Sequence, residues 1–519
     1  MTTDLRGAPV LVVGAGLMGA GIAQVAALAG HPVLLHDARA GVAAQAKAKL
    51  VATLDGLVAK GRLDADRARA ALQRLEPVDT LAAGVGARLV VEAIVEQLEA
   101  KRALFAELER IVGADAVLAT NTSSISVTAI AAGLAQPGRV VGMHFFNPVP
   151  LMKLVEVVSG LHTAPVVADA VFALAQAWGK VPVHAKSTPG FIVNRIARPY
   201  YAEALALLHE QAATPQVLDA CLRAAGFRMG PCELMDLIGH DTNFAVTHSV
   251  YAANFQDKRY MPSLVQAELV AGGLLGRKSG RGFYTYPAGP PALPVVAHAA
   301  PAGLAKGTQG ATAAHGADGA RDIVVHGQGP IADALADALA QAGGGSAARQ
   351  RASGWSGLAV AGARLMLTDG RCAGEIAAAG GGDDVAVFDR PLRLPWPAGS
   401  ALAYALAERS SAAWCAQAAA WLAALGFAPQ PVADSPGLVV ARTVAMLINE
   451  AADAVQQGVC TPGGADAAMR LGLNYPAGPF EWLAGWDARG VVALVDALDA
   501  AYRGERYRAS PWLRRRLWA

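Results

Sequence analysis

The sequence is short of cysteine, of net charge and of long apolar runs, and each shortage excludes a class of protein. Its five cysteines are odd in number and form no CxxC pair, which excludes a disulfide or zinc framework and is typical of a reducing compartment. A net charge of +2 argues against a general surface for nucleic acid. No uninterrupted apolar run reaches membrane length, and no signal peptide is recognisable, so we expect a cytoplasmic protein with no membrane span.

Length and apolar content favour several packed domains. A chain of 519 residues exceeds what one hydrophobic core usually holds, so we expect three or more domains. Hydrophobic residues make up 54% of the chain and charged residues 17%, which suits buried α/β architecture rather than disorder.

A glycine-rich turn stands between a predicted strand and a predicted helix. The apolar run 10–13 leads directly into the turn, and residues 20–28 have a helical pattern. Glycines at these positions permit a tight turn and the close approach of a pyrophosphate to the helix N-terminus. The alternative is a plain glycine turn. The pattern favours a dinucleotide site with cofactor contacts at Gly14, Gly16, Leu17, Met18 and Gly19.

An acid follows the second predicted strand, 33–36. Asp37 lies 18 residues after Gly19, near the spacing expected of a carboxylate that binds the ribose 2′-hydroxyl. Because such a carboxylate repels a 2′-phosphate, the cofactor we expect is NAD rather than NADP. The neighbouring Arg39 weakens this preference slightly.

A histidine and a glutamate twelve residues apart are the strongest chemical signal. His144 ends an apolar, strand-like run, and Glu156 follows after a Phe-Phe-Asn-Pro segment. Oxidation of an alcohol needs a base for the hydroxyl proton and a carboxylate that orients the imidazole, and this pair supplies both. A satisfied interior histidine is the alternative.

Polar residues also follow the predicted strand 116–119. Ligands bind at the carboxyl ends of strands in doubly wound sheets, so Ser123 is a candidate for the site. Its alternative is an N-cap of the following helix, and either Ser123 or Ser124 could provide that cap.

From Val10 to about Tyr286 these motifs resemble the 3-hydroxyacyl-CoA dehydrogenase family. The resemblance implies that His144 removes the 3-hydroxyl proton while Glu156 holds the ring. It also implies that Ser123 and Asn194 bind the substrate, although Asn194 could simply be a polar group at a helix start.

The resemblance extends to the cofactor and to coenzyme A. It places Glu96 and Lys101 beside the nicotinamide, with Asn121, Ser123 and Asn147 as further cofactor contacts. The helical pattern of 38–81 would form a hairpin that touches coenzyme A through Thr53 and Lys60. The alternatives are a solvated helix start for Glu96 and Lys101 and a solvated surface charge for Lys60. No metal is implied.

The predicted fold is an α/β Rossmann-type domain, an all-α domain, a degenerate α/β segment and a second all-α domain. The predicted boundaries are 1–187, 188–286, a Pro/Ala/Gly-rich linker at 287–321, 322–434 and 435–519.

An internal repeat relates the two helical domains. Ser435–Arg442 mirrors Thr188–Arg195, and Glu450 mirrors Glu203. In the second copy alanine, Ala441, replaces Asn194, and no histidine follows His326. The chemistry therefore excludes a second redox site. We expect the helical domains to form an internal pseudo-dimer with one active site per chain, and further homo-oligomerisation stays open.

The function that we expect is NAD-dependent oxidation of (3S)-3-hydroxyacyl-CoA to 3-oxoacyl-CoA. The leading substrate is 3-hydroxyadipyl-CoA from aromatic-acid breakdown, and 3-hydroxybutyryl-CoA is its competitor. A non-catalytic NAD or acyl-CoA binding protein is the alternative from another class. A phosphogluconate-like hydroxyacid dehydrogenase, which uses a lysine base, is the alternative within the class.

Overall fold

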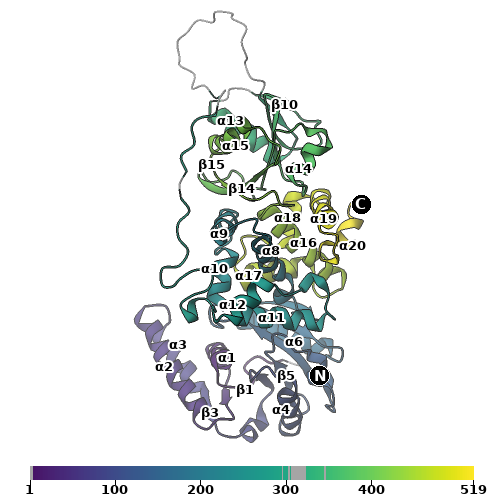
Figure 1. Ribbon diagram of the computed structural model, residues 1–519. Helices are drawn as coiled ribbons and strands as arrows, with labels where there is room; N and C mark the ends of the chain where they lie inside the picture. Colours follow the sequence, from purple (N-terminus) through teal and green to yellow (C-terminus); the bar gives the residue numbers. More distant parts are fainter. Residues whose placement is uncertain (1–3, 295, 302–303, 305–322, 344–346, 519) are drawn as a thin grey trace, which may run out of the picture. The chain divides into compact units, whose positions relative to one another are not determined.

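The computed structural model describes residues 4–294, 296–301, 304, 323–343 and 347–518 (Figure 1). The chain forms two compact units. One comprises Met1–Ile196 and Ala451–Glu481, and the other comprises Ala197–Glu450 and Trp482–Ala519. Residues 295, 302–303 and 305–321 of the predicted linker lie outside the described residues.

The first unit is built on an eight-stranded sheet in the order β3-β2-β1-β4-β5-β6-β7-β8. Neighbouring strands are parallel except β6 and β7, which are antiparallel. The central strands are apolar and buried on both faces, as a sheet covered by helices requires. The strands are β1 Val10–Val13, β2 Val33–His36, β3 Leu75–Val78, β4 Leu89–Glu92, β5 Val117–Thr120, β6 Val140–Phe145, β7 Leu154–Ser159 and β8 Val181–Lys186.

Helices connect these strands, and the first unit also contains one helix of the second helical copy, α17. They are α1 Leu17–Leu28, α2 Val42–Ala59, α3 Ala65–Arg74, α4 Leu98–Ile111, α5 Val127–Ala131, α6 Pro165–Ala177, α7 Val193–Ile196 and α17 Pro462–Leu473, with short 3-10 turns at η1 Leu81–Gly86 and η2 Pro137–Arg139.

The insertion at 38–81 is helical for most of its length. Helices α2 and α3 contact each other and form the predicted hairpin, drawn in purple in Figure 1. The prediction of helix up to residue 81 was wrong at its end. Leu75–Val78 is the edge strand β3, because these residues pair with β2 and an edge strand tolerates Pro77.

The second unit contains a seven-stranded sheet in the order β10-β9-β11-β12-β13-β14-β15. Here β11 runs antiparallel to both of its neighbours, β9 and β12. The strands are β9 Ile323–His326, β10 Ala348–Gln350, β11 Gly357–Val360, β12 Ala363–Leu367, β13 Val385–Phe388, β14 Ser400–Leu406 and β15 Phe427–Pro431.

The remaining helices belong wholly or partly to this unit. Helices α16 and α18 cross the division between the units. The helices are α8 Arg198–His209, α9 Pro215–Ala224, α10 Pro231–Ile238, α11 His240–Ala253, α12 Leu264–Ala271, α13 Pro330–Gln341, α14 Ala373–Ile376, α15 Ala412–Ala424, α16 Val440–Gln456, α18 Pro479–Trp486, α19 Ala488–Tyr502 and α20 Pro511–Arg515, with 3-10 or π turns η3 Lys258–Tyr260, η4 Arg277–Ser279, η5 Ala377–Gly381 and η6 Glu505–Tyr507.

Within the second unit the two repeats exchange matching contacts. Glu203 of the first copy accepts hydrogen bonds from Arg442, Arg506 and Tyr507 of the second. Glu450 of the second copy accepts hydrogen bonds from Arg259 and Tyr260 of the first.

The exchange extends the repeat beyond the motifs recognised in the sequence. Arg506-Tyr507 follows Arg442 at the same spacing at which Arg259-Tyr260 follows Arg195. An interface in which equivalent residues contact each other reciprocally is the hallmark of two-fold association.

Candidate active site

The glycine turn is tight at both ends and open in the middle. A Cβ on Gly14 would collide with the Ala93 carbonyl, and one on Gly19 would collide with the Gly14 carbonyl. A Cβ on Gly16 would meet nothing within 4 Å. Gly16 is also the N-cap of α1, and no side chain caps that helix end. The turn therefore leaves space and unblocked amides where a pyrophosphate would approach.

Asp37 lies at the end of β2 beside this turn. Its carboxylate accepts a hydrogen bond from the Ala15 amide at 3.0 Å and pairs with Arg39 at 3.1 Å. Burial raises the pKa of Asp37, but the hydrogen bonds from Arg39 and Ala15 outweigh burial and hold the pKa below its usual value. The acid is therefore ionised at neutral pH.

His144 and Glu156 face each other across the β6–β7 pair. They are direct register partners in the antiparallel ladder, which brings residues twelve apart into contact. His144 Nδ1 lies 2.5 Å from Glu156 Oε2, and both side chains are buried. Because a carboxylate only accepts hydrogen bonds, Nδ1 carries the hydrogen and Nε2 remains a base.

The other oxygen of Glu156 is also occupied. Oε1 accepts hydrogen bonds from the Ile192 and Val193 amides, each at 3.0 Å, at the start of α7. The fully buried carboxylate thus orients the imidazole and also holds the chain segment that carries Asn194.

Glu96 and Lys101 form part of a buried ionic cluster. Lys101 Nζ lies 2.5 Å from Glu92 and 3.2 Å from Glu96, and its side chain is 1% exposed. The alternative of a solvated acid and base is therefore wrong for Lys101. Burial raises the pKa of Glu96, but Lys101 and the hydroxyl of Thr122 outweigh that effect, and the pKa is lowered.

Glu92 is a residue that sequence reasoning missed. Its fully buried carboxylate accepts hydrogen bonds from Lys101, from the Thr120 hydroxyl and from the Ile94 amide. The only signal in the sequence was an acid at the end of an apolar strand.

Ser123 lies against Glu96 and caps no helix. Its amide donates to Glu96 Oε1 at 2.9 Å, and its carbonyl oxygen is 3.5 Å from Asn194 Nδ2. Ser126 caps α5, since its hydroxyl accepts from the Ala129 amide. The alternative in which Ser123 or Ser124 is the cap is therefore wrong.

A cavity of 360 Å³ brings half of the predicted residues together. Its lining includes His144 and residues from the ends of β4, β5 and β6. Asn121 also holds the histidine strand, because its side chain accepts a hydrogen bond from the Phe145 amide at 2.8 Å. The predicted residues that line the cavity are Met18, Glu96, Lys101, Asn121, Ser123, His144, Asn147 and Asn194.

A second cavity of the first unit, 570 Å³ in volume, adjoins the glycine turn. Gly16, Leu17, Thr53 and Asn147 contribute to its lining. The hydroxyl of Thr53 donates to the Lys49 carbonyl in its own helix. Lys60 lies at the exposed end of α2 and lines neither cavity, so the structure does not bring it to the predicted residues.

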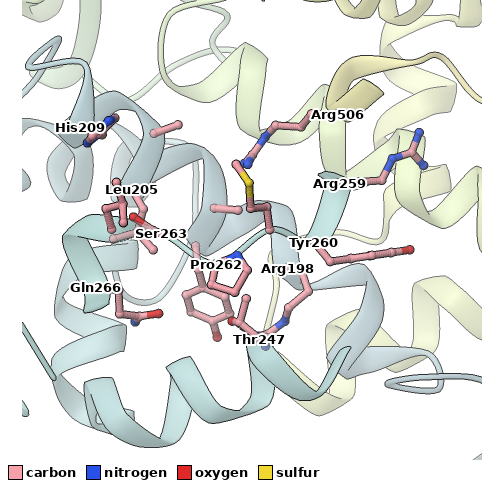
Figure 2. A pocket seen from close by; sticks show the side chains of 15 residues that line it. Arg198, Leu205, His209, Thr247, Arg259, Tyr260, Pro262, Ser263, Gln266 and Arg506 are labelled. Atoms are coloured by element: carbon pink, nitrogen blue, oxygen red, sulfur yellow. Dashed lines mark hydrogen bonds between the residues drawn. The ribbon is translucent and has the colours of Figure 1, made fainter. Parts of the chain in front are cut away.

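A pocket of 170 Å³ in the second unit contains none of the predicted site residues (Figure 2). Among the described residues, no group of three or more histidine, cysteine, aspartate or glutamate side chains could hold a metal ion. In the same part of the chain, no helix has the length and apolarity that a membrane crossing requires.

The doubly wound sheet, the open glycine turn and the buried histidine–glutamate pair define a Rossmann-type dehydrogenase. Family models agree along the chain. The NAD binding domain of 3-hydroxyacyl-CoA dehydrogenase matches 9–188, and its C-terminal domain matches both 190–286 and 437–519. The 3-hydroxybutyryl-CoA dehydrogenase reduced Rossmann-fold domain matches 365–436.

Known proteins of full length are similar to this chain. It is 43% identical over 98% of its length, and 97% of the relative's, to a 3-hydroxyadipyl-CoA dehydrogenase of Escherichia coli (strain K12). It is 42% identical over 53% of its length, and 99% of the relative's, to a probable 3-hydroxybutyryl-CoA dehydrogenase of Deinococcus radiodurans. The crystal structure of a 3-hydroxybutyryl-CoA dehydrogenase from Escherichia coli K12 matches with a TM-score of 0.86 and 42% identity, covering 99% of both chains.

The chain belongs to the 3-hydroxyacyl-CoA dehydrogenase family. The family resemblance and the fold class predicted from the sequence are confirmed.

Proposed function

We propose that this protein oxidises (3S)-3-hydroxyacyl-CoA to 3-oxoacyl-CoA with NAD as the hydride acceptor. The observation that carries the proposal is the buried His144–Glu156 pair, whose histidine lines a cavity together with Ser123 and Asn194. A non-catalytic binding protein has no need of an oriented imidazole base beside a cofactor turn.

His144 Nε2 takes the proton of the 3-hydroxyl group as the C3 hydride is transferred. The ring becomes imidazolium, and Glu156 stabilises that charge while fixing the tautomer. Ser123 and Asn194 supply polar groups that hold the oxygen on C3 in place.

The residues of the glycine turn fit NAD. Gly14, Gly16, Leu17, Met18 and Gly19 would hold the pyrophosphate, and the ionised Asp37 would bind the ribose 2′-hydroxyl. When bound, NAD supplies the hydride acceptor. Glu96, Lys101, Asn121 and Asn147 line the cavity at which the nicotinamide would be held.

The substrate that we propose first is 3-hydroxyadipyl-CoA, because a relative named 3-hydroxyadipyl-CoA dehydrogenase matches 98% of this chain. 3-Hydroxybutyryl-CoA is the second candidate, since the full-length structural match carries that name. Thr53, which lines the cavity beside the turn, and Lys60, on the same helix, are the proposed contacts to coenzyme A.

We further propose that the helical repeats form an internal pseudo-dimer and that 188–286 and 435–519 are its domains. The reciprocal bonds of Glu203 and Glu450 support this proposal. All five cysteines are free, which supports a reducing, cytoplasmic location.

Steady-state kinetics of the purified protein, with NAD and a panel of 3-hydroxyacyl-CoA thioesters, tests the function. We expect turnover of the (3S) thioesters, with the highest kcat/KM for 3-hydroxyadipyl-CoA. Binding of NADH without turnover of any thioester would favour the non-catalytic alternative. A higher kcat/KM for 3-hydroxybutyryl-CoA would reverse the order of the substrates.

A further inference from the structure

Part of the second helical copy belongs to the unit that contains the site. Residues Ala451–Glu481 group with the Rossmann-type sheet, and α17 packs against β7, β8 and α7. Two of these elements carry site residues, Glu156 on β7 and Asn194 on α7. A segment of the copy that lacks the predicted catalytic residues therefore packs against the elements that carry Glu156 and Asn194.

Gly472, near the end of α17, lies close to side chains of β7, α7 and the loop after β6. A Cβ at this position would lie 2.8 Å from Leu154 Cδ2, 3.1 Å from Val193 Cγ2 and 3.7 Å from Phe146 Cε1. These distances leave no room for a larger side chain unless the neighbours move.

Each of these three neighbours is linked to a site residue. The Phe146 ring lies 4.5 Å from the His144 ring, centroid to centroid. The Val193 amide donates to Glu156, and Leu154 lies two residues before Glu156 on β7. A displacement at Gly472 would therefore reach both members of the histidine–glutamate pair.

Hydrogen bonds from the same segment fix the adjoining chain. Gln457 Oε1 accepts from Arg195 Nη1 at 2.7 Å, and Arg195 is the buried neighbour of Asn194. The Val459 carbonyl accepts from the Lys186 amide at 3.0 Å, where β8 ends.

We propose that residues 457–472 of the second copy are positioning residues for His144, Glu156 and Asn194. The inference rests on the proposed function and adds a role for the second helical copy, which lacks the predicted catalytic residues. Interiors are close-packed, so they transmit small displacements. A misplacement of about 1 Å costs on the order of a hundredfold in rate.

The first test compares Gly472→Val with Gly463→Val. Both residues are on α17, but a Cβ on Gly463 would meet nothing within 4 Å. We expect Gly472→Val to lower kcat by about tenfold or more, since it displaces the reacting groups. The acidic limb of its pH–kcat profile should shift as well, while the dissociation constant for NADH stays unchanged. The control should match the wild type.

Equal kcat and equal pH profiles in the two variants would overturn the proposal, even if Gly472→Val melts at a lower temperature. Such a result would leave α17 a purely structural support.

A second pair of variants guards against misfolding of Gly472→Val. Gln457→Leu removes the acceptor for Arg195, whereas Gln457→Glu keeps an oxygen in that place. We expect the leucine variant to lower kcat for the thioester severalfold and the glutamate variant to restore it. Wild-type kcat in both variants would contradict a role for Gln457.

The two proposals fail separately. Absence of turnover in the wild type, on the thioester panel, would sink the proposed function. Wild-type turnover that neither Gly472→Val nor Gln457→Leu changes would sink only the positioning role.

Discussion

Two buried acids, one in the sheet segment before each helical copy, hold the same kind of chain segment and differ in what else they do. Glu156 accepts from the amides of Ile192 and Val193 and still has an oxygen for His144. Asp389 accepts from the amides of Val439, Val440 and Ala441 and has no imidazole partner.

Both acids anchor a helix that starts just after a Pro-Gly pair, so the fold needs a carboxylate there whether or not there is chemistry. The difference lies in the strand beside it. Asp389 follows β13 and its amide donates to the Ala403 carbonyl of β14, whereas Glu156 pairs with His144 across the β6–β7 ladder. Of the two anchors, only Glu156 has a histidine opposite it, and this is the pair for which we propose a catalytic role.

The two glycine turns also differ in the residue that follows the next strand. The Gly14 amide donates to the His36 carbonyl, and the Gly327 amide donates to the Gln350 carbonyl. The next residue is Asp37 in the first unit and Arg351 in the second. The second turn thus lacks the acid that would bind a ribose.

The strand beside each turn also runs in a different direction in the two units. Beside β1 the parallel strand β4 ends at the turn, but beside β9 the antiparallel strand β11 begins there. The chain that leads into β11 contacts the turn, since a Cβ on Gly327 would collide with Ser356. A Cβ on Gly329, like one on Gly16, would meet nothing within 4 Å. His326 stacks on Trp355 with ring centroids 4.1 Å apart.

We expect the largest effect when the histidine that distinguishes the first unit is replaced. His144→Gln should lower kcat by roughly a hundredfold to ten-thousandfold, because the general base is lost. NADH binding, measured by fluorescence titration, should be unchanged since the glycine turn is untouched. Near-normal turnover would show that His144 is only an interior residue. Glu156→Gln should also lower kcat, and it should shift the acidic limb of the pH–rate profile.

The reciprocal contacts of the repeats should matter for stability in both copies. Glu203→Gln should lower the free energy of unfolding by up to about 3–5 kcal/mol, because it removes a carboxylate that pairs with the buried Arg442 and with the partly buried Arg506. Urea denaturation measures this loss, and Glu450→Gln should also destabilise. No change in either variant would contradict the internal pseudo-dimer.

Asp389→Asn should destabilise the protein and spare the chemistry. The buried amides that it holds lose part of their acceptor, at a cost of about 1–3 kcal/mol. The kcat of this variant should equal that of the wild type. A fall in kcat as large as that of Glu156→Gln would show that Asp389 also contributes to catalysis.

The pH dependence of Asp389 sharpens the same contrast. Burial raises its pKa to about 6 from 3.8, so the folded state binds the proton more tightly than the unfolded state does. Its contribution to stability is therefore complete below about pH 4 and is lost as the pH rises through 6. The stability difference between wild type and Asp389→Asn, from urea titrations at several pH values, should shrink across that window. A difference that stays constant or grows would contradict this.

Asp37 should account for the cofactor preference of the first turn. Asp37→Ser should lower the ratio of kcat/KM for NAD to kcat/KM for NADP by at least about tenfold. The substitution removes the repulsion between the carboxylate and the 2′-phosphate of NADP, and a like-charge contact costs several kcal/mol. Arg39, released from its partner, should assist the phosphate. Equal use of both cofactors by the wild type would show that Asp37 does not contact the ribose.

Lys60 should have the smallest effect. Lys60→Ala should raise KM for the coenzyme A thioester by about twofold to fivefold, the range of an exposed charge contact. A truncated thioester without the nucleotide should show no change. Equal effects on both thioesters would make Lys60 an ordinary surface charge.

By itself the sequence determined the features that are local or periodic. The strand, the glycine turn and the acid after β2 follow from residue types at short spacing, and the repeat follows from motifs that recur. His144 and Glu156 could be paired from the sequence because a hairpin joins their strands.

The tertiary structure decided which side chains face each other across strands and helices that are distant in the chain. Lys101 could not be recognised as buried until the β4 end placed Glu92 beside it. Ser126 rather than Ser123 is the cap of α5, because the helix begins at Val127 and the Ser126 hydroxyl accepts from the Ala129 amide. Asp389 and Gly472 gained their roles from segments about 50 and more than 270 residues away. Such contacts depend on packing and carry no signature in residue spacing.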